Sequence, residues 1–361
     1  MELLALHQRV IAAIESWDPL GSSPWEHCFE ELAAQVFAHQ YEWNTPYRRL
    51  CTNRGISPET LKGIDQIPAV PTDAFKLTRL FGDVEPLQTF RTSGTTAQQR
   101  GAHHFRTLEV YRASLQGPFV RFCNPEQQKT RFMLLAPSRA DLPESSLSFM
   151  LDELLKRWGT KKSAHYIELC DQGSWQLKKS QLQADLHEAC TEETPVMMMG
   201  TAFAFAEFFE GLTGTFALPQ GSRVMETGGF KGRTRSFTRE ELYQAFEERL
   251  QLEASHCLSE YSMTELSSQT YTRGGDRRFF APPWLQIQIV DPLSLQPYQE
   301  VEKQGLIRFL DLANVDSVLA IQTSDRGILS ADGGLTLLGR APDAELRGCS
   351  LTIEEITTQG S

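Results

Sequence analysis

The sequence predicts an α/β fold with at least one largely parallel sheet, and three observations lead to this class. From residue 91 to about 290, apolar strand-like runs alternate with amphipathic helical segments, as in chains built from βαβ units. Residues 300–361 have instead the pattern of short strands and turns. The chain has 361 residues, more than one hydrophobic core usually holds, so we expect one large lobed domain or two domains.

The first 90 residues are expected to be helical and then irregular. Five apolar residues repeat at the i, i+3, i+4, i+7 spacing of one helix face, so residues 1–62 are predicted to be helical. These residues are Phe29, Leu32, Ala33, Val36 and Phe37. Residues 63–90 contain Pro68, Pro71 and Pro86, which predicts an irregular connector into the core.

The rest of the chain carries the strand and helix signals. The helix candidate 239–252 follows Thr238, which can act as its N-cap, and Glu241 completes a capping box. Apolar runs predict strands both in the core and in the last part of the chain. The strand candidates are 131–136, 164–169, 195–199, 285–290, 305–310, 318–322 and 334–339.

Composition excludes several classes of function. The net charge is −11 and no run of like charges offsets it, so we expect no nucleic-acid partner. The first residues lack the basic start and long apolar stretch of a signal peptide, and no apolar run reaches the ~18 residues that span a bilayer. Seven cysteines are widely spaced with no C-x-x-C pair, which indicates reduced thiols and a cytoplasmic location.

Residues 92–101 read Thr-Ser-Gly-Thr-Thr-Ala-Gln-Gln-Arg-Gly. Their backbone N–H groups, hydroxyls and one arginine suit a polyphosphate. The segment resembles the phosphate loop T-S-G-T-T-G-x-x-K-G of AMP-forming acyl-adenylating enzymes, with Ala97 in place of glycine and Arg100 in place of lysine. By itself, a loop of this composition is more often only a loop. The resemblance implies that nucleotide phosphates bind at Thr92, Ser93, Gly94, Thr95 and Thr96.

Residues 260–265 read Glu-Tyr-Ser-Met-Thr-Glu and are similar to the Y-G-x-T-E motif of the same enzymes, with Ser262 for glycine. The resemblance implies that Tyr261 stacks on adenine, Thr264 bonds the α-phosphate and Glu265 ligates Mg²⁺. A single carboxylate is reasonable chemistry, because Mg²⁺ takes oxygen ligands and often only one or two carboxylates beside the phosphates. The alternative is a strand end or a capped helix start.

Two further segments follow in the order that these enzymes show. Residues 323–327, Thr-Ser-Asp-Arg-Gly, are similar to the T-G-D motif, which implies that Asp325 accepts hydrogen bonds from both ribose hydroxyls. Its alternative is a β-turn. Residues 339–343, Gly-Arg-Ala-Pro-Asp, resemble a G-R-x-x-D segment, which implies that Arg340 also reaches the ribose and Asp343 lies at a hinge. The shared order of the motifs predicts adenylate formation.

One more segment, 226–232, contains Gly228, Gly229 and Phe230. Its glycines would let the backbone approach adenine with Phe230 alongside, as a similar stretch does in relatives, and a tight hairpin turn is compatible with this. His103 and His104 follow the phosphate-loop motif, and at most one can face a ligand, because neighbours on a strand point to opposite sides.

Acyl-adenylating enzymes normally continue with a mobile domain that carries a catalytic lysine, whereas no lysine follows Lys303 in this chain. This departure points to one branch, the acyl-protein synthetases of the bacterial bioluminescence fatty-acid reductase complex. The resemblance rests on Tyr47 and Cys51, on Phe75 and Lys76, and on the segments 145–147 and 347–350. It implies a large N-terminal domain with layered α/β/α sheets and a small β-rich C-terminal lobe. We divide the chain into 1–90, 91–299 and 300–361.

The same resemblance implies a two-step reaction. ATP and Mg²⁺ would activate a fatty acid as an acyl-adenylate, with Arg100 and the loop hydroxyls stabilising the charge that develops. The acyl group would pass to Cys349 as a thioester and then to a partner acyl reductase. Cys349 lies nine residues beyond Arg340, a reach of up to about 30 Å for an extended chain, and Arg347 would favour its thiolate. Alternatively, Cys349 only packs the last turn.

Two other functions stay open at this point. The chain could be an acyl or aryl ligase that transfers to coenzyme A or to a carrier-protein thiol. It could also be a non-catalytic nucleotide-binding subunit, an alternative suggested by the substitutions at Ala97 and Arg100. The residues do not indicate the chain length of the acid, the identity of the partner or the oligomeric state.

Overall fold

The structure is a computed structural model of the whole chain, and it describes residues 2–21, 25, 27–93, 99–170, 174–212, 214–228, 238–342, 352 and 355–356. These residues form two compact units, each gathered from separate stretches of the sequence. Unit 1 holds residues 1–117, 263–269 and 280–361, and unit 2 holds 118–262 and 270–279. The sequence-based division into three ranges stays a prediction.

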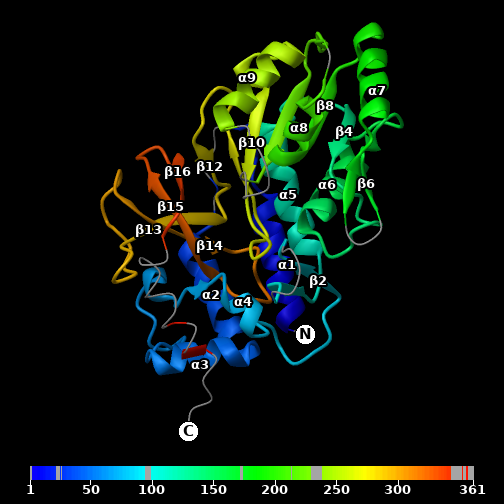
Figure 1. Cartoon of the computed structure of the whole chain (residues 1–361). Helices are drawn as coiled ribbons and strands as arrows, with labels where there is room; N and C mark the ends of the chain where they lie inside the picture. Colours follow the sequence, from blue (N-terminus) through cyan, green and yellow to red (C-terminus); the bar gives the residue numbers. More distant parts are fainter. Residues whose placement is uncertain are drawn as a thin grey trace. The chain divides into compact units, whose positions relative to one another are not determined.

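Unit 1 begins with three helices, which confirms the prediction for the start of the chain (Figure 1). The apolar face that the spacing indicated is buried in the second of them, where Leu32, Val36 and Phe37 are inaccessible or nearly so. Asn44 ends this helix and caps the next, because its side chain accepts a hydrogen bond from the Tyr47 N–H. The helices are α1 (Glu2–Glu15), α2 (Phe29–Trp43) and α3 (Thr45–Asn53).

The connector that follows is short and irregular, as its prolines predicted. Its elements are η1 (Ile64–Gln66), β1 (Val70–Pro71), α4 (Ala74–Leu77) and β2 (Gln88–Arg91). Strand β3 (Ala102–Phe105) pairs with β2 in an antiparallel hairpin, and α5 (Glu109–Phe122) follows.

The last part of unit 1 is a small antiparallel sheet, which confirms the strand-and-turn pattern. Strands β13, β14, β15 and β16 are neighbours in that order, and β1 adds to β15 in parallel. The motif at 323–327 lies inside β15, so the alternative of a β-turn at this position is wrong. The strands are β13 (Leu285–Val290), β14 (Gln304–Asp311), β15 (Ala320–Leu329) and β16 (Leu335–Arg340).

Unit 2 contains the parallel sheet that the sequence predicted. Strands β5, β4, β8, β9 and β10 run parallel in that order, and β11 pairs antiparallel with β10. The strands are β4 (Arg131–Leu135), β5 (Ala164–His165), β8 (Val196–Thr201), β9 (Arg223–Thr227), β10 (Cys257–Tyr261) and β11 (Thr270–Thr272). Strand β12 (Phe279–Phe280) follows at the boundary of the two units.

Helices fill the connections of this sheet. Helices α8 and α9 lie side by side (Figure 1), with the rings of Phe205 and Phe246 5.1 Å apart in one buried core cluster. The capping box of Thr238 and Glu241 is present at the start of α9. The helices are α6 (Ser146–Trp158), α7 (Lys179–Thr191), α8 (Ala202–Phe209), α9 (Arg239–Leu250) and η3 (Ala254–His256).

The strand predicted at 164–169 is wrong as a single element. The backbone leaves the parallel sheet after His165, and β6 (Ile167–Leu169) pairs instead with β7 (Trp175–Leu177). The change of partner buries Ile167 and Leu177 together in the core cluster of unit 2. A run of apolar residues therefore predicted extended backbone correctly here, but not its hydrogen-bonding partner.

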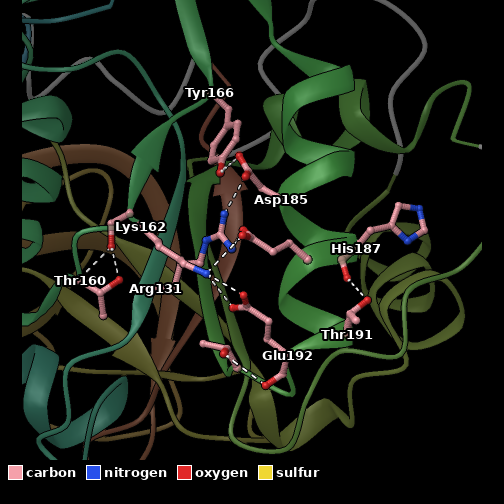
Figure 2. A network of polar contacts seen from close by, with 11 residues as sticks. Arg131, Thr160, Lys162, Tyr166, Asp185, His187, Thr191 and Glu192 are labelled. Atoms are coloured by element: carbon pink, nitrogen blue, oxygen red, sulfur yellow. Dashed lines mark hydrogen bonds and ion pairs between the residues drawn. The ribbon is translucent and has the colours of Figure 1, made fainter.

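A network of polar contacts connects strand β4 to helix α7 (Figure 2). Arg131 is buried, and its guanidinium donates to Asp185 at 2.7 Å and to Glu188 at 2.6 Å. The hydroxyl of Tyr166 donates to the second oxygen of Asp185, at 2.8 Å. Lys162 joins from the surface through Glu188, at 3.2 Å, and also pairs with Glu192, at 2.7 Å. Within the described residues, no helix is long and apolar enough to cross a membrane.

Candidate active site

The β2–β3 hairpin forms the base of the predicted phosphate loop. Beyond the last strand pair, the Thr92 N–H donates to the Gly101 carbonyl at 2.9 Å, and the Gly101 N–H donates to the Thr92 hydroxyl at 2.9 Å. A β-carbon on Gly101 would lie 3.0 Å from Thr92 Cγ2, so any other residue at this position would crowd the Thr92 side chain. Thr92 and Ser93 are described, whereas Gly94, Thr95 and Thr96 lie outside the described residues.

Arg100 is directed at the backbone of the loop's own base. Its Nε donates to the Thr92 carbonyl at 2.7 Å, and Nη2 donates to the Arg91 carbonyl at 3.3 Å. Hydrogen bonds from a charged donor are among the stronger ones in proteins. The guanidinium therefore fixes the point where the loop leaves the hairpin, and its predicted role in catalysis stays a prediction.

His103 connects the loop base to the threonine–glutamate motif, a role that the sequence did not predict. It lies on β3, and its Nδ1 is 2.9 Å from the Thr264 carbonyl oxygen. Burial lowers the pKa of His103 to about 4, so the ring is neutral at pH 7 and Nδ1–H is the donor. Thr264 is thereby held beside the hairpin that carries the phosphate-loop motif.

Glu265 follows Thr264 directly, and a second buried side chain holds its backbone. The Asn314 amide donates to the Glu265 carbonyl at 2.8 Å, and Asn314 is itself buried. Glu265 is 6% exposed. Its carboxylate is the hard oxygen donor that Mg²⁺ prefers, so the residue type and its fixed backbone fit the predicted metal role.

Asp325 and Arg340, the two residues predicted to bind ribose, face each other from neighbouring strands. They are register partners in β15 and β16, with 3.7 Å between Asp325 Oδ1 and Arg340 Nε. The Asp325 N–H is held by the Thr323 hydroxyl at 3.1 Å, and the Ala341 N–H donates to the Ser324 carbonyl at 2.8 Å. An acceptor and a donor for a sugar diol are thus presented together.

The two segments predicted beside adenine meet within unit 2. Gly228 follows β9 and Tyr261 ends β10, and the preceding residues Thr227 and Glu260 are register partners. Gly228 has φ +76°, a conformation that favours glycine. Both segments lie at the carboxyl ends of neighbouring parallel strands, where α/β sheets bind ligands. Gly229 and Phe230 lie outside the described residues.

Two buried carboxyl groups precede these segments and were missed by the sequence analysis. Burial raises the pKa of Glu226 to about 7, and it also raises that of Glu260. The Ser259 hydroxyl donates to Glu226 and the Thr227 hydroxyl donates to Glu260. The available signal was a glutamate inside an apolar strand run, directly before each motif, since perturbed acids gather at functional sites.

The thiol chemistry predicted for Cys349 lies outside the described residues, as do Arg347 and Asp343. Beyond this segment, Arg54 at the end of α3 donates to the Thr352 hydroxyl at 2.7 Å and to the Glu355 carboxylate at 2.8 Å. Burial raises the pKa of the Cys51 and Cys257 thiols to about 12. These two thiols are therefore poor nucleophiles at pH 7.

A comparison with protein-family models decides the family. The model described as "Acyl-protein synthetase, LuxE" matches residues 12–358. The chain belongs to this family. A LuxE relative, the long-chain-fatty-acid–luciferin-component ligase of Aliivibrio fischeri, is 21% identical over 337 residues, which are 89% of this chain and 86% of the relative. This chain is accordingly an AMP-forming acid ligase that activates its acid through an adenylate.

Solved structures show the same fold at low sequence identity. An open conformation of 2-hydroxyisobutyryl-CoA ligase, in complex with 2-HIB-AMP and CoA, has a TM-score of 0.62 and 14% identity, covering 91% of this chain and 81% of that one. The thioesterification state of that ligase has a TM-score of 0.60 and 14% identity, covering 94% and 69%. This chain thus has the fold of an adenylating enzyme.

Proposed function

We propose that this protein uses ATP to activate a long-chain fatty acid, transfers the acyl group to its own Cys349 as a thioester, and delivers it to a partner acyl reductase. The name of the Aliivibrio fischeri relative supports a long-chain fatty acid. Membership of the acyl-protein synthetase family supports a protein thiol as the acceptor. The C-terminal motif Arg-Gly-Cys-Ser at 347–350 supports Cys349 as that thiol.

One observation carries the adenylation step. The hydrogen bond from His103 to the Thr264 carbonyl joins the base of the phosphate loop to the predicted phosphate and metal ligands. The two motifs are 161 residues apart at these atoms, so their proximity is a property of the fold and not of local sequence. A shared position is what ATP needs from them, because its phosphates and its metal ion must be bound together.

In the proposed reaction, ATP binds along residues 92–96, Glu265, Asp325 and Arg340. A carboxylate oxygen of the fatty acid attacks the α-phosphorus, and the bond to the β-phosphate oxygen breaks with its electron pair leaving on pyrophosphate. Mg²⁺ bound at Glu265 would neutralise phosphate charge. The Cys349 thiolate then attacks the acyl carbon, and the bond to AMP breaks to leave a thioester.

The decisive experiment is the intact mass of the protein after incubation with ATP, Mg²⁺ and a panel of free acids. We expect an acyl-sized mass gain that maps to Cys349 and is removed by hydroxylamine. Cys349→Ser should lose the adduct and keep acid-dependent pyrophosphate exchange. Cys28→Ser, which changes an exposed cysteine, is the matched control and should still be labelled.

Glu265→Gln separates the metal role from the thiol role, because it should lose both the adduct and pyrophosphate exchange. Retained exchange in this variant would contradict the assignment of Glu265. Labelling of Cys349→Ser at the wild-type level would contradict the assignment of the nucleophile. If AMP forms without any adduct, the acceptor is coenzyme A or a carrier-protein thiol, and a chain that forms no AMP is a nucleotide-binding subunit.

A further inference from the structure

Lys76 lies beside the base of the predicted phosphate loop, although it is distant from this loop in sequence. It belongs to the short helix α4, which follows β1. The Phe75 ring meets the His103 ring edge to face, with 5.7 Å between their centroids. The methylene stem of Lys76 runs along Gly101, so that a β-carbon on this glycine would lie 3.6 Å from Lys76 Cγ.

The same helix is tied to the strand that carries Asp325. Strand β1 pairs in parallel with β15, and the Thr72 N–H donates to the Gln322 carbonyl at 3.1 Å. Helix α4 therefore stands between the strand of the predicted ribose ligand and the hairpin of the predicted phosphate loop.

The ammonium group of Lys76 is available to an anion. It pairs with Asp73 Oδ1 at 2.6 Å, while the side chains of Lys76 and Asp73 are 44% and 53% exposed. Exposed ion pairs of this kind contribute little to stability. A polyphosphate carries more negative charge than one carboxylate, and lysine is a common phosphate ligand that acts as a mobile point charge.

The arginine of the loop itself is held elsewhere. Two nitrogens of Arg100 are hydrogen-bonded to the backbone carbonyls of Arg91 and Thr92. These bonds hold its guanidinium at the foot of the loop. Arg100 thus stabilises the backbone at the base of the loop, while Lys76, on α4, packs against Gly101 at the same base.

We propose that Lys76 binds the β- and γ-phosphates of ATP and stabilises pyrophosphate as the leaving group. This inference rests on the proposed adenylation. When the bond between the α-phosphorus and the bridging oxygen breaks, the electron pair stays on that oxygen. The ammonium of Lys76 meets the negative charge that grows on pyrophosphate, and no proton is transferred.

The test compares the affinities of ATP and AMP for the full-length protein, by calorimetry with Mg²⁺ and without acid. Lys76→Met keeps the apolar stem against Gly101 and removes the charge. It should weaken ATP binding roughly 10- to 100-fold, as expected for a charge-assisted contact, and change AMP binding by less than about 2-fold. Lys76→Arg should restore most of the ATP affinity.

Lys303→Met is the matched control, because Lys303 also forms a half-exposed i,i+3 ion pair, with Glu300 at 3.3 Å. It should leave both affinities unchanged. Equal losses of ATP and AMP affinity in Lys76→Met, unchanged ATP binding, or the same ATP loss in Lys303→Met would each overturn the assignment of Lys76 alone. Failure of the unaltered chain to bind ATP would overturn the proposed function together with it.

Discussion

At the scale of single residues, Asp325, the predicted ribose ligand, has a backbone that is fixed in the structure. It lies in the middle of a ten-residue strand, its N–H is bonded to the Thr323 hydroxyl, and Arg340 faces it from the next strand. The backbone of Asp325 is therefore held by β16 and by the Thr323 hydroxyl, and little backbone ordering is left to occur on binding. Preorganisation of this kind favours a role in binding over a role in stability.

Asp325→Asn should weaken ATP and AMP binding to a similar extent, by about 10-fold, because a neutral amide accepts more weakly than a carboxylate and both nucleotides carry the ribose. This pattern differs from that of Lys76→Met, which discriminates between the two nucleotides. Calorimetry under the same conditions measures both. Asp332→Asn, in the turn between β15 and β16, is the control. A loss confined to ATP in Asp325→Asn would contradict contact with the ribose.

At the scale of elements, α7 is held to the sheet of unit 2 by charge as well as by apolar packing. Leu182, Leu186 and Ala189 bury one face of this helix. Arg131 reaches from β4 to two of its carboxylates (Figure 2) and is 3% exposed. A buried charge of this kind is costly if its partners are lost, so the network specifies where α7 lies along the strand.

Arg131→Met should lower the free energy of unfolding by about 2–4 kcal/mol, since it leaves Asp185 partly buried without its cation. Urea unfolding followed by circular dichroism measures the change. Lys162→Met removes another cation of the same network, but one whose side chain is 49% exposed, and should cost less than about 0.5 kcal/mol. Equal costs for the two variants would show that burial does not set the strength of the network.

At the scale of the whole molecule, His103 and His165 have pKa values shifted in opposite directions, and both shifts make the stability of the protein depend on pH. Burial lowers the pKa of His103 to about 4. Burial also lowers the pKa of His165, but hydrogen bonds to Asp152 and the Ala136 carbonyl outweigh it and raise this pKa overall. Below pH 6.5 the unfolded chain takes up a proton at His103 while the folded chain does not. The contribution of His103 to stability is therefore lost as the pH is lowered from 6.5 toward 4. For His165 the stabilisation is present at low pH and is lost as pH rises through its folded pKa.

His103→Asn isolates the first effect, because asparagine can keep a donor near the Thr264 carbonyl but does not titrate. The shift of His103 corresponds to about 3 kcal/mol between pH 6.5 and 4. We expect the variant to be less stable than the wild type at pH 7, and the difference to shrink as pH falls toward 4. Urea midpoints across this range measure it. A difference that is constant with pH would mean that the pKa of His103 is the same in the folded and the unfolded protein.

The sequence predicted much of the fold because many signals are local. The apolar spacing from Leu32 to Phe37, the capping box at Thr238 and the parallel strands between residues 131 and 261 are all present in the structure. Asp325 and Arg340, which the motifs predicted to bind the ribose, are register partners on neighbouring strands, and their role at the ribose stays a prediction. Each of these depends on residues within one element or on motifs whose order had a known meaning.

The amino-acid sequence by itself therefore determined the fold class, the motif order and the residues that carry the proposed chemistry. Only the tertiary structure decided that β6 leaves the sheet after His165, that His103 joins the two phosphate motifs, and that Lys76 stands beside Gly101. The physical reason is the same in each case. The energies of these contacts depend on burial and geometry that no local pattern of residue types encodes.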